Sequence, residues 1–208
     1  MFRAEMSDRL IAGKLEAACR CATIGRQIIV QEQTGSTNDA ILQVTTANSN
    51  EGLVLFAEHQ TAGRGQRGNR WESAAGKGLW FSILLQPKLQ INDSGRLTIW
   101  ALETISDVIQ TGFSLEPTIK LPNDVQLYSR KVAGVLVEMR AQEKAPHLAV
   151  VGIGINVNQS LEDFPAELRS RAISLAIAMH QPVDRQKLAI AILQNLDRTY
   201  RARFAGNS

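Results

Sequence analysis

Apolar and polar residues alternate with two different periods along the chain, and these periods predict helices and strands. Residues 3–21 repeat apolar side chains at near-helical spacing, and RQIIVQEQ at 26–33 has the composition of a strand. The apolar runs GLVLFAE at 52–58 and GLWFSILLQP at 78–87 are typical of buried strands. The first part of the chain is therefore predicted to contain a helix that leads into a sheet.

The second half of the chain continues this mixture. Residues 95–112 repeat apolar side chains with the period of a helix. Strand-like segments follow at 115–120, 124–128, 131–140 and 147–153. The segments 124–128 and 131–140 predict a hairpin that turns at Ser129-Arg130. Two closing helices are expected near 165–180 and 184–204. Grouped strands with helices at both ends predict an α+β fold, a mixed central β-sheet covered by helices, without regular βαβ alternation.

A short polar segment precedes another predicted helix. Ser36 and Asp39 form a Ser-x-x-Asp capping box, and the following residues place Ala40, Ile41 and Val44 on one side. The backbone N–H groups at the start of such a helix are free to bind a polar ligand. Ser36 taken alone is an N-cap residue, and that role is compatible with ligand binding.

Composition narrows the class of protein. The 208 residues are 44% hydrophobic and 21% charged, enough for one sizeable core, so we expect a single domain over residues 1–208. A formal charge of +3 without a lysine- or arginine-rich run argues against a nucleic-acid-binding arm. No apolar stretch reaches the roughly 18 residues of a membrane span, and the N-terminal residues are unlike a secretory signal. We expect a cytoplasmic protein with no nucleic-acid or membrane partner.

The two cysteines, Cys19 and Cys21, lie two positions apart in the first predicted helix. Side chains at this spacing point in different directions on a helix, so we expect no disulfide between them. A reducing compartment fits this pattern.

The segment at 59–78, HQTAGRGQRGNRWESAAGKG, joins two predicted strands and contains five glycines, three arginines and a lysine. Its literal GxGxxG at Gly63, Gly65 and Gly68 opens no helix, which argues against a dinucleotide fold. Glycine N–H groups and arginine side chains can surround an anion such as phosphate, although a solvated basic loop is the alternative. Because ordering the loop costs entropy, we expect it to be mobile when empty and closed when occupied.

Five short motifs follow one another along the chain. They are QTGSTN at 33–38, QTAGRGQRG at 60–68, KLPND at 120–124, RKVAGVLVE at 130–138 and GIGINVN at 152–158. In order and spacing they resemble the motifs of the biotin protein ligases, and the resemblance covers about residues 30–200. It implies the biotin/lipoyl protein ligase fold, which is like that of class II aminoacyl-tRNA synthetases.

The resemblance implies a biotin–[acetyl-CoA-carboxylase] ligase that works in two steps. Biotin and ATP give biotinoyl-5′-AMP and pyrophosphate, and a lysine of a biotin carrier domain then takes the biotinoyl group. The first nucleophile is the carboxylate of biotin, which is ionised near neutral pH, so no protein base is needed. The step instead needs positioning, cations and a metal ion, because two anions must meet.

No set of residues is predicted to hold the metal ion. His59, His147 and His180 lack metal-ligand spacing. We therefore expect Mg²⁺ to arrive with ATP, held by phosphate and a few oxygens, with Asp124 as a candidate contributor.

The resemblance also assigns roles to individual residues. Lys131 and Arg64 are the predicted catalytic residues: Lys131 would reach both the biotin carboxylate and the phosphate, and Arg64 would lie along biotin and its carboxylate. The predicted biotin contacts are Ser36, Thr37, Asn38, Gln60, Gly63, Arg64, Gly65, Gln66, Lys131 and Gly134. The predicted ATP contacts are Arg67, Arg70, Trp71, Asn123, Asp124, Lys131 and Asn156.

Several of these residues have a second interpretation. Lys131 alone could be a solvated lysine at a hairpin, and Trp71 could be a core residue. Asn123 and Asn156 follow strand ends and could be turn residues. Glu138 is either a paired structural acid or part of the site.

The sequence departs from the resembled pattern at three places. Gln66 and Asn69 stand where arginines are usual, so either Arg67, Arg70 and Lys77 compensate or the adenylate is held less tightly. Leu121 replaces a usual tryptophan and is expected to alter the packing beneath the site. We also expect a catalytic domain alone, without an N-terminal winged helix-turn-helix domain or the usual C-terminal domain.

Two other functions remain open at this point. Lipoate ligases and octanoyltransferases share the fold, but the transferases need a nucleophilic cysteine, and Cys19 and Cys21 lie far upstream of the motifs. A non-catalytic biotin-binding module is the second alternative, made conceivable by Gln66. The sequence leaves open whether the protein is a monomer or a homodimer.

Overall fold

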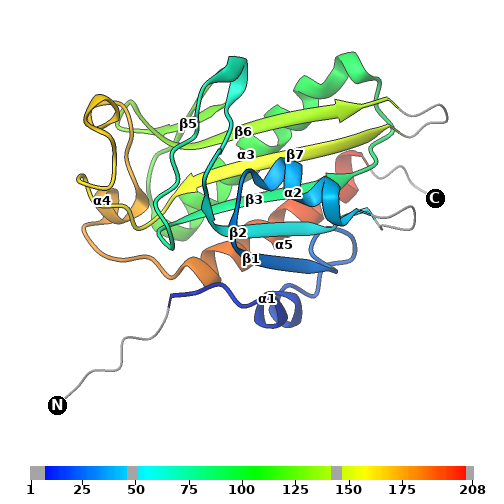
Figure 1. Ribbon diagram of the computed structural model, residues 1–208, viewed down its shortest axis with the longest axis horizontal. Coiled ribbons are helices and arrows are strands. Elements are labelled where there is room, and N and C mark those ends of the chain that lie inside the picture. The colour runs from blue at the N-terminus through cyan, green and yellow to red at the C-terminus, as the bar shows by residue number, and fades with distance from the viewer. Residues whose placement is uncertain (1–7, 46–50, 142–146, 205–208) are drawn as a thin grey trace.

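The computed structural model describes residues 8–45, 51–141 and 147–204 and is built around one mixed β-sheet (Figure 1). Its seven strands lie in the order β1-β2-β3-β7-β6-β5-β4. They are β1 Ile28–Thr34, β2 Val54–Gln60, β3 Gly78–Leu85, β4 Thr118–Lys120, β5 Asp124–Leu127, β6 Arg130–Arg140 and β7 Leu148–Asn156. Only β1 and β2 pair in parallel, and the other neighbours are antiparallel. This confirms the predicted mixed sheet.

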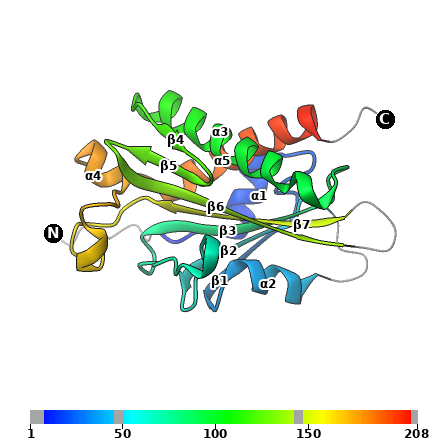
Figure 2. The ribbon, with the colours of Figure 1, turned by 90° about the horizontal axis from the view of Figure 1, so that it is seen from above.

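Helices cover the two faces of the sheet unequally (Figure 2). On one face lie α1 Ala12–Cys19, α3 Ser94–Phe113 and α5 Arg185–Arg203, whose apolar side chains join the larger hydrophobic core. On the other face α2 Thr37–Val44 packs Ala40 and Ile41 against Leu55, Leu84 and Val150 in a smaller core. The loop between β2 and β3 lies beside α2 on this second face, which leaves part of the sheet there without a helix.

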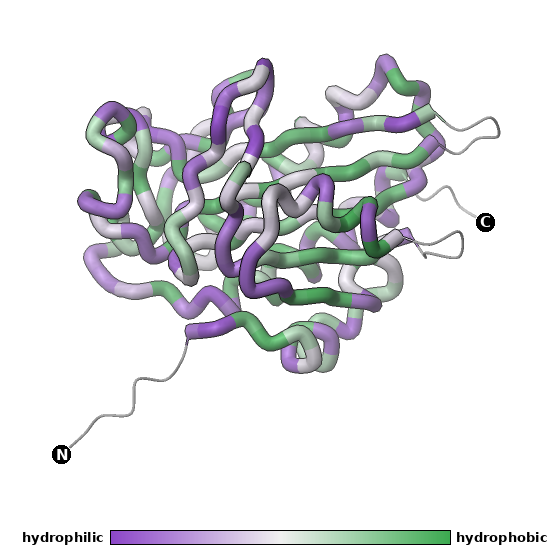
Figure 3. The backbone as a smooth tube through the Cα atoms, in the orientation of Figure 1, coloured by the Kyte–Doolittle hydropathy of each residue, from purple (hydrophilic) through white to green (hydrophobic). Residues whose placement is uncertain are grey.

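The apolar runs of the sequence lie along the central strands of the sheet (Figure 3), and their side chains are buried. All eight residues of β3 are buried, as expected for a strand with helices or loop on both sides. The predicted strands and the helices at 95–112 and 184–204 are confirmed, with ends displaced by a few residues. Among the described residues, no helix has both the length and the apolar character to cross a bilayer.

The predicted helix near 165–180 is wrong. This segment contains a single 3₁₀ turn, Ala166–Leu168, and the short helix α4, Leu175–Met179; between them lie a turn at 169–171 and a short extended stretch that ends at Ser174. Lys131 N donates to Arg171 O at 2.7 Å, and Ile173 N donates to Lys131 O at 2.9 Å. This pairing with the start of β6 takes the backbone groups that a helix would use, so a tertiary contact overrides the local pattern.

The first helix is shorter than the predicted range 3–21, of which residues 3–7 lie outside the described residues. α1 begins at Ala12 because Leu10 and Ile11 donate their backbone N–H groups to side chains on β2 and α5. It ends at Cys19, with Arg20 in the left-handed conformation at φ 48°. Cys21 is therefore off the helix, contrary to expectation, and its thiol donates to Cys19 O at 3.6 Å. Both cysteines are free, and the neighbouring Cys21 thiol together with burial raises the pKa of Cys19.

The hairpin between β5 and β6 is confirmed, but its turn is one residue earlier than predicted. Tyr128 and Ser129 occupy the turn with φ of 50° and 60°, and Arg130 already belongs to β6. Two consecutive residues of positive φ match the right-handed twist of the flanking strands.

Asp197 on α5 anchors the chain that follows α1. Its carboxylate, on a residue that is 4% exposed, accepts backbone hydrogen bonds from Ala22, Thr23 and Ile24 at 3.1, 2.7 and 2.8 Å. Asp197→Ala should lower the free energy of unfolding by about 3 kcal/mol, because three buried donors lose their acceptor. Urea denaturation measures this loss. Asp107→Ala, at an exposed position of α3, is the control, and an equal loss in both variants would contradict the anchor.

Candidate active site

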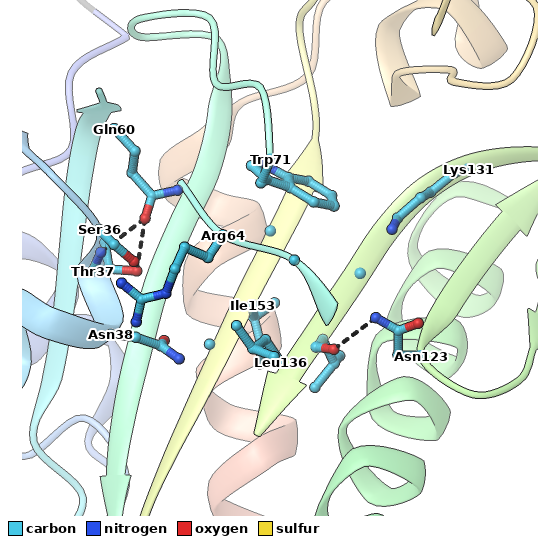
Figure 4. A pocket seen from close by; sticks show the side chains of 15 residues that line it. Ser36, Thr37, Asn38, Gln60, Arg64, Trp71, Asn123, Lys131, Leu136 and Ile153 are labelled. Carbon is cyan, nitrogen blue, oxygen red and sulfur yellow. Dashed lines mark hydrogen bonds between the residues drawn. The ribbon is translucent and has the colours of Figure 1, made fainter. Parts of the chain in front are cut away.

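A pocket lies on the second face of the sheet, between α2, the β2–β3 loop and strands β6 and β7 (Figure 4). Many residues predicted from the sequence meet there. Those that line it are Ser36, Thr37, Asn38, Gln60, Arg64, Gly65, Trp71, Asn123, Lys131 and Gly134. Residues from four of the five motifs are thus brought together by the fold, and Gly152 and Gly154 of the fifth form part of the floor.

Glycines on two neighbouring strands make the floor of the pocket flat. Gly134 on β6 is the cross-strand partner of Gly154 on β7. A Cβ atom at Gly134 would lie 2.8 Å from the Trp71 ring, and one at Gly154 would lie 2.5 Å from it. Trp71 therefore packs directly on the sheet backbone, which no other residue at these two positions would allow.

Trp71 also contacts side chains at the same end of the pocket. Its ring meets Trp80 edge to face, with centroids 5.9 Å apart, and the Lys131 ammonium lies 4.9 Å from its centroid. The indole Nε1 is buried without a hydrogen-bond partner. Trp71 is thus both packed and exposed to the pocket, and its free donor is a group that a ligand could satisfy.

A β-bulge aims Lys131 into the pocket. The register between β5 and β6 shifts by one residue, so Val132 on β6 has no paired residue on β5. Strict alternation would place Lys131 on the same face as Ala133, which belongs to the larger core. The extra residue moves Lys131 to the pocket face instead.

Lys131 is held in place by several contacts. Its Nζ lies 2.6 Å from Asp124 Oδ1 on β5, and its backbone pairs with Arg171 and Ile173 on the segment before α4. The side chain is 31% exposed. Lys131 is therefore a fixed cation that faces the pocket, and not a freely solvated lysine of a turn.

The other end of the pocket is built from hydroxyl and amide groups. Ser36 is the N-cap residue of α2, but its side chain makes no capping hydrogen bond. Instead, Gln60 Oε1 accepts from Thr37 N at 2.8 Å and from Thr37 Oγ1 at 3.1 Å. The predicted capping box is wrong, because Asp39 N donates to the backbone carbonyl of Ser36 at 3.1 Å and the Asp39 carboxylate accepts from Arg64 instead. The Ser36 hydroxyl is left to the pocket.

Ser82 in the middle of β3 is a site residue that the sequence analysis missed. Its hydroxyl is fully buried and lies 2.8 Å from Thr37 Oγ1 and 2.6 Å from Asn38 Oδ1. The available signal was one serine in the otherwise apolar run GLWFSILL. A buried hydroxyl needs a partner, and here it finds two at the start of α2.

Arg64 lies at this same end, beside Asn38, and not beside Lys131 (Figure 4). Its guanidinium makes a bidentate pair with Asp39, one bond of which is 2.9 Å, and lies 3.4 Å from Glu138. The hydrogen bond from Arg64 holds the pKa of Asp39 below its usual value, and Asp39 raises the pKa of Arg64. Glu138 thus contacts the site, although it does not line the pocket.

The two asparagines use their side chains to bind backbone. Asn123 Nδ2 donates to Val135 O at 3.1 Å, and Asn156 Nδ2 donates to Ile173 O at 3.1 Å. Asn123 still lines the pocket, whereas Asn156 lies behind the start of β6. Asn123 thus holds β6, the strand that carries Lys131, and Asn156 holds the start of β6 against the segment before α4.

Several predicted residues of the β2–β3 loop lie away from the pocket. Gly63 O accepts from Trp71 N at 2.9 Å, which closes the loop into a narrow hairpin. Beyond it, Gln66 does not line the pocket, Arg67 is exposed, and Arg70 is exposed and paired with Glu72 at 3.0 Å. The structure therefore does not bring the second and third arginines of the loop to Lys131.

Two further residues differ from expectation. Leu121 is 66% exposed and does not pack beneath the site, so that expectation was wrong. Lys77 was one of the residues expected to compensate for Gln66 and Asn69, but its Nζ lies 2.6 Å from Asp163 Oδ2, with which it is paired. Within the described ranges no three histidine, cysteine, aspartate or glutamate side chains gather as a metal site.

Comparison with known proteins gives relatives over most of the chain. Residues 30–156 match the model of the biotin/lipoate A/B protein ligase family. The bifunctional ligase/repressor BirA of Bacillus subtilis is 32% identical over 193 residues, 93% of this chain and 59% of the relative. The biotin–[acetyl-CoA-carboxylase] ligase of Mycobacterium tuberculosis is 32% identical over 200 residues, 91% of this chain and 72% of the relative.

Solved structures agree with this result. The biotin protein ligase from Aquifex aeolicus in complex with biotin and ATP superposes with a TM-score of 0.73 and 30% identity, over 86% of this chain and 73% of that one. The predicted ligase fold is confirmed. The chain spans 59% of the length of its curated Bacillus relatives.

Replacement of Ser36 tests whether its side chain caps α2. Because the Ser36 hydroxyl caps nothing, Ser36→Ala should change the free energy of unfolding by less than about 0.5 kcal/mol. Asp184 is the matched control, since its side chain accepts from Lys187 N at 2.9 Å and caps α5. Asp184→Ala should cost about 1 kcal/mol in chemical denaturation. A loss at Ser36 as large as that at Asp184 would show a capping role.

Proposed function

The chain belongs to the biotin/lipoate A/B protein ligase family, and we propose that it is an ATP-dependent biotin protein ligase. It would convert biotin and ATP to biotinoyl-5′-AMP and transfer the biotinoyl group to a lysine of a biotin carrier domain, such as that of acetyl-CoA carboxylase. The observation that carries this proposal is a single pocket with a hydroxyl and amide cluster at one end and Lys131 at the other. The ligase names of the relatives support it.

The two ends of the pocket suit the two ends of biotin. The ureido ring is neutral and rich in hydrogen-bonding groups, so it fits the end with Ser36, Thr37 and Asn38. The carboxylate tail would then reach Lys131 across the glycine floor. A fixed ammonium can stabilise both the attacking carboxylate and the charge that develops on the α-phosphate of ATP.

The side chains of the pocket must move to admit these substrates. Its free volume is about 30 Å³, which is room for roughly two water molecules. Trp71 and Arg64 fill much of the space (Figure 4), and both belong to the β2–β3 loop. This supports the expectation that the loop opens and closes around the ligand. We propose that Trp71 then covers the nucleotide.

The reaction needs cations near the phosphates. Mg²⁺ enters as the ATP complex and would be held mainly by phosphate oxygens, with Asp124 as the nearest carboxylate to Lys131. In the transfer step, the amine of the carrier lysine attacks the adenylate carbonyl, and AMP leaves as the bond from carbon to phosphate oxygen breaks. We place the activity in the cytoplasm, where ATP and the apo carrier domain occur, and leave monomer and homodimer as equal proposals.

Lipoate is the second candidate substrate, since the family includes lipoate ligases. The pocket favours biotin, because an apolar dithiolane ring would offer no partner to the Ser36 hydroxyl, which caps nothing, or to the second Nδ2 hydrogen of Asn38. The position of the cysteines argues against an octanoyltransferase that uses a nucleophilic cysteine. Cys19 and Cys21 lie at the end of α1 beside Asp197, on the opposite face of the sheet from the pocket.

The function is tested by incubating the protein with ATP, Mg²⁺, an apo biotin carrier domain and either radiolabelled biotin or lipoate. We expect acid-stable label on the carrier lysine from biotin only. Label from lipoate would support the second candidate. Biotin binding without transfer from either acid would indicate a non-catalytic module.

Lys131→Ala tests the residue on which the first step depends. Biotin-dependent exchange of pyrophosphate into ATP should fall at least about 100-fold, as expected when a charge at the transition state is removed. The melting temperature should stay close to that of the wild type, because the lysine lies in a pocket. Lys187→Ala, a lysine with 84% side-chain exposure on α5, is the matched control. Near-normal exchange in Lys131→Ala would remove its assigned role.

A further inference from the structure

Glu138 joins two parts of the pocket without lining it. It stands on β6 opposite Val150 of β7, one row beyond the glycine floor. Its Oε2 accepts a hydrogen bond from Asn38 Nδ2 at 2.6 Å, and its two oxygens each lie 3.4 Å from Arg64 Nη2. One carboxylate therefore connects the start of α2 with the β2–β3 loop.

The contact with Glu138 determines which way the Asn38 amide faces. A carboxylate can only accept, so it selects the Nδ2 end of the amide, while the Ser82 hydroxyl contacts the Oδ1 end at 2.6 Å. Asn38 is 3% exposed, and a Cβ atom at Gly152 would lie only 2.2 Å from Oδ1, so the amide is tightly confined. The second Nδ2 hydrogen is then the group that Asn38 can offer to a ligand.

Glu138 also belongs to a charge network at this end of the pocket. Arg64 carries one positive charge and has two carboxylates beside it, those of Asp39 and Glu138. Arg140 is a second cation near Asp39 and, after Arg64, helps to lower the pKa of that carboxyl. The two carboxylates are thus matched by two guanidinium groups, and Glu138 helps to hold Arg64 beside Asn38.

We propose that Glu138 is a positioning residue: it fixes the Asn38 amide as a donor for a neutral carbonyl of the ligand and holds Arg64 of the β2–β3 loop beside it. This inference rests on the proposed function and decides between the two interpretations of Glu138 in favour of the site. Glu138 acts through Asn38 and Arg64 and does not touch the reacting atoms.

The test combines substitutions at Glu138 with measurements of biotin binding and turnover. Glu138→Ala should raise Kd and KM for biotin about tenfold, the loss expected for one charged hydrogen bond, and change kcat by less than about twofold. Glu138→Gln keeps an oxygen that accepts from Asn38, so its Kd should rise no more than about threefold. Glu116→Gln, an exposed carboxylate outside the pocket, is the control and should bind like the wild type.

A double-mutant cycle shows whether Glu138 acts through Asn38. In an Asn38→Ala background, Glu138→Ala should add less than about threefold to Kd, because the amide that it orients is gone. Fully additive effects of the two substitutions on Kd would overturn the inference. It would also be overturned if Glu138→Ala lowered kcat and the melting temperature but left Kd unchanged. Either result would leave the ligase function intact. Failure of the wild type to bind biotin would overturn the proposed function as well. If Glu138→Ala does not fold, Glu138→Gln in the same cycle decides.

Discussion

The site depends on a sheet face from which side chains are missing. Gly134, Gly152 and Gly154 lie on the neighbouring strands β6 and β7, and each would place a Cβ atom within 2.8 Å of a pocket side chain. Real Cβ atoms do not approach so closely, so larger residues would lift Trp71 and Asn38 off the sheet. Two segments that are far apart in the sequence, the start of α2 and the β2–β3 loop, can therefore meet on the same backbone surface.

The position of the lysine follows from two departures from regular structure. The bulge at Val132 turns Lys131 to the pocket face, and the extended segment before α4 holds its backbone from outside the sheet. Asn156 supports the same arrangement by donating to the carbonyl groups of Lys131 and Ile173 at 3.3 and 3.1 Å. A lysine whose backbone is paired and whose ammonium contacts Asp124 loses little conformational entropy when a ligand binds, which favours charge stabilisation without reorganisation.

The sequence predicted the elements that depend on local pattern and missed what depends on tertiary pairing. Long apolar runs predicted β2 and β3, and helical periodicity predicted α3 and α5, because burial alone determines these segments. The segment 165–180 failed because its backbone pairs with Lys131 instead of with itself. The motif resemblance named ten of the residues that line the pocket. It gave no sign that Arg67 and Arg70 face away, that Ser82 joins the network, or that Glu138 reaches across to α2.

Lys131 and Arg64, the two cations that line the pocket, each have a carboxylate partner within the protein, Asp124 for Lys131 and Asp39 with Glu138 for Arg64. Such pairing offsets the cost of partly burying a charge, and it also means that an incoming anion must compete with an internal one. Ground-state binding is weakened by this competition. A transition state that concentrates negative charge beside Lys131 gains more from the ammonium than either separate substrate does. In the proposed reaction, the paired arrangement therefore shifts electrostatic stabilisation from the binding of the substrates toward their reaction.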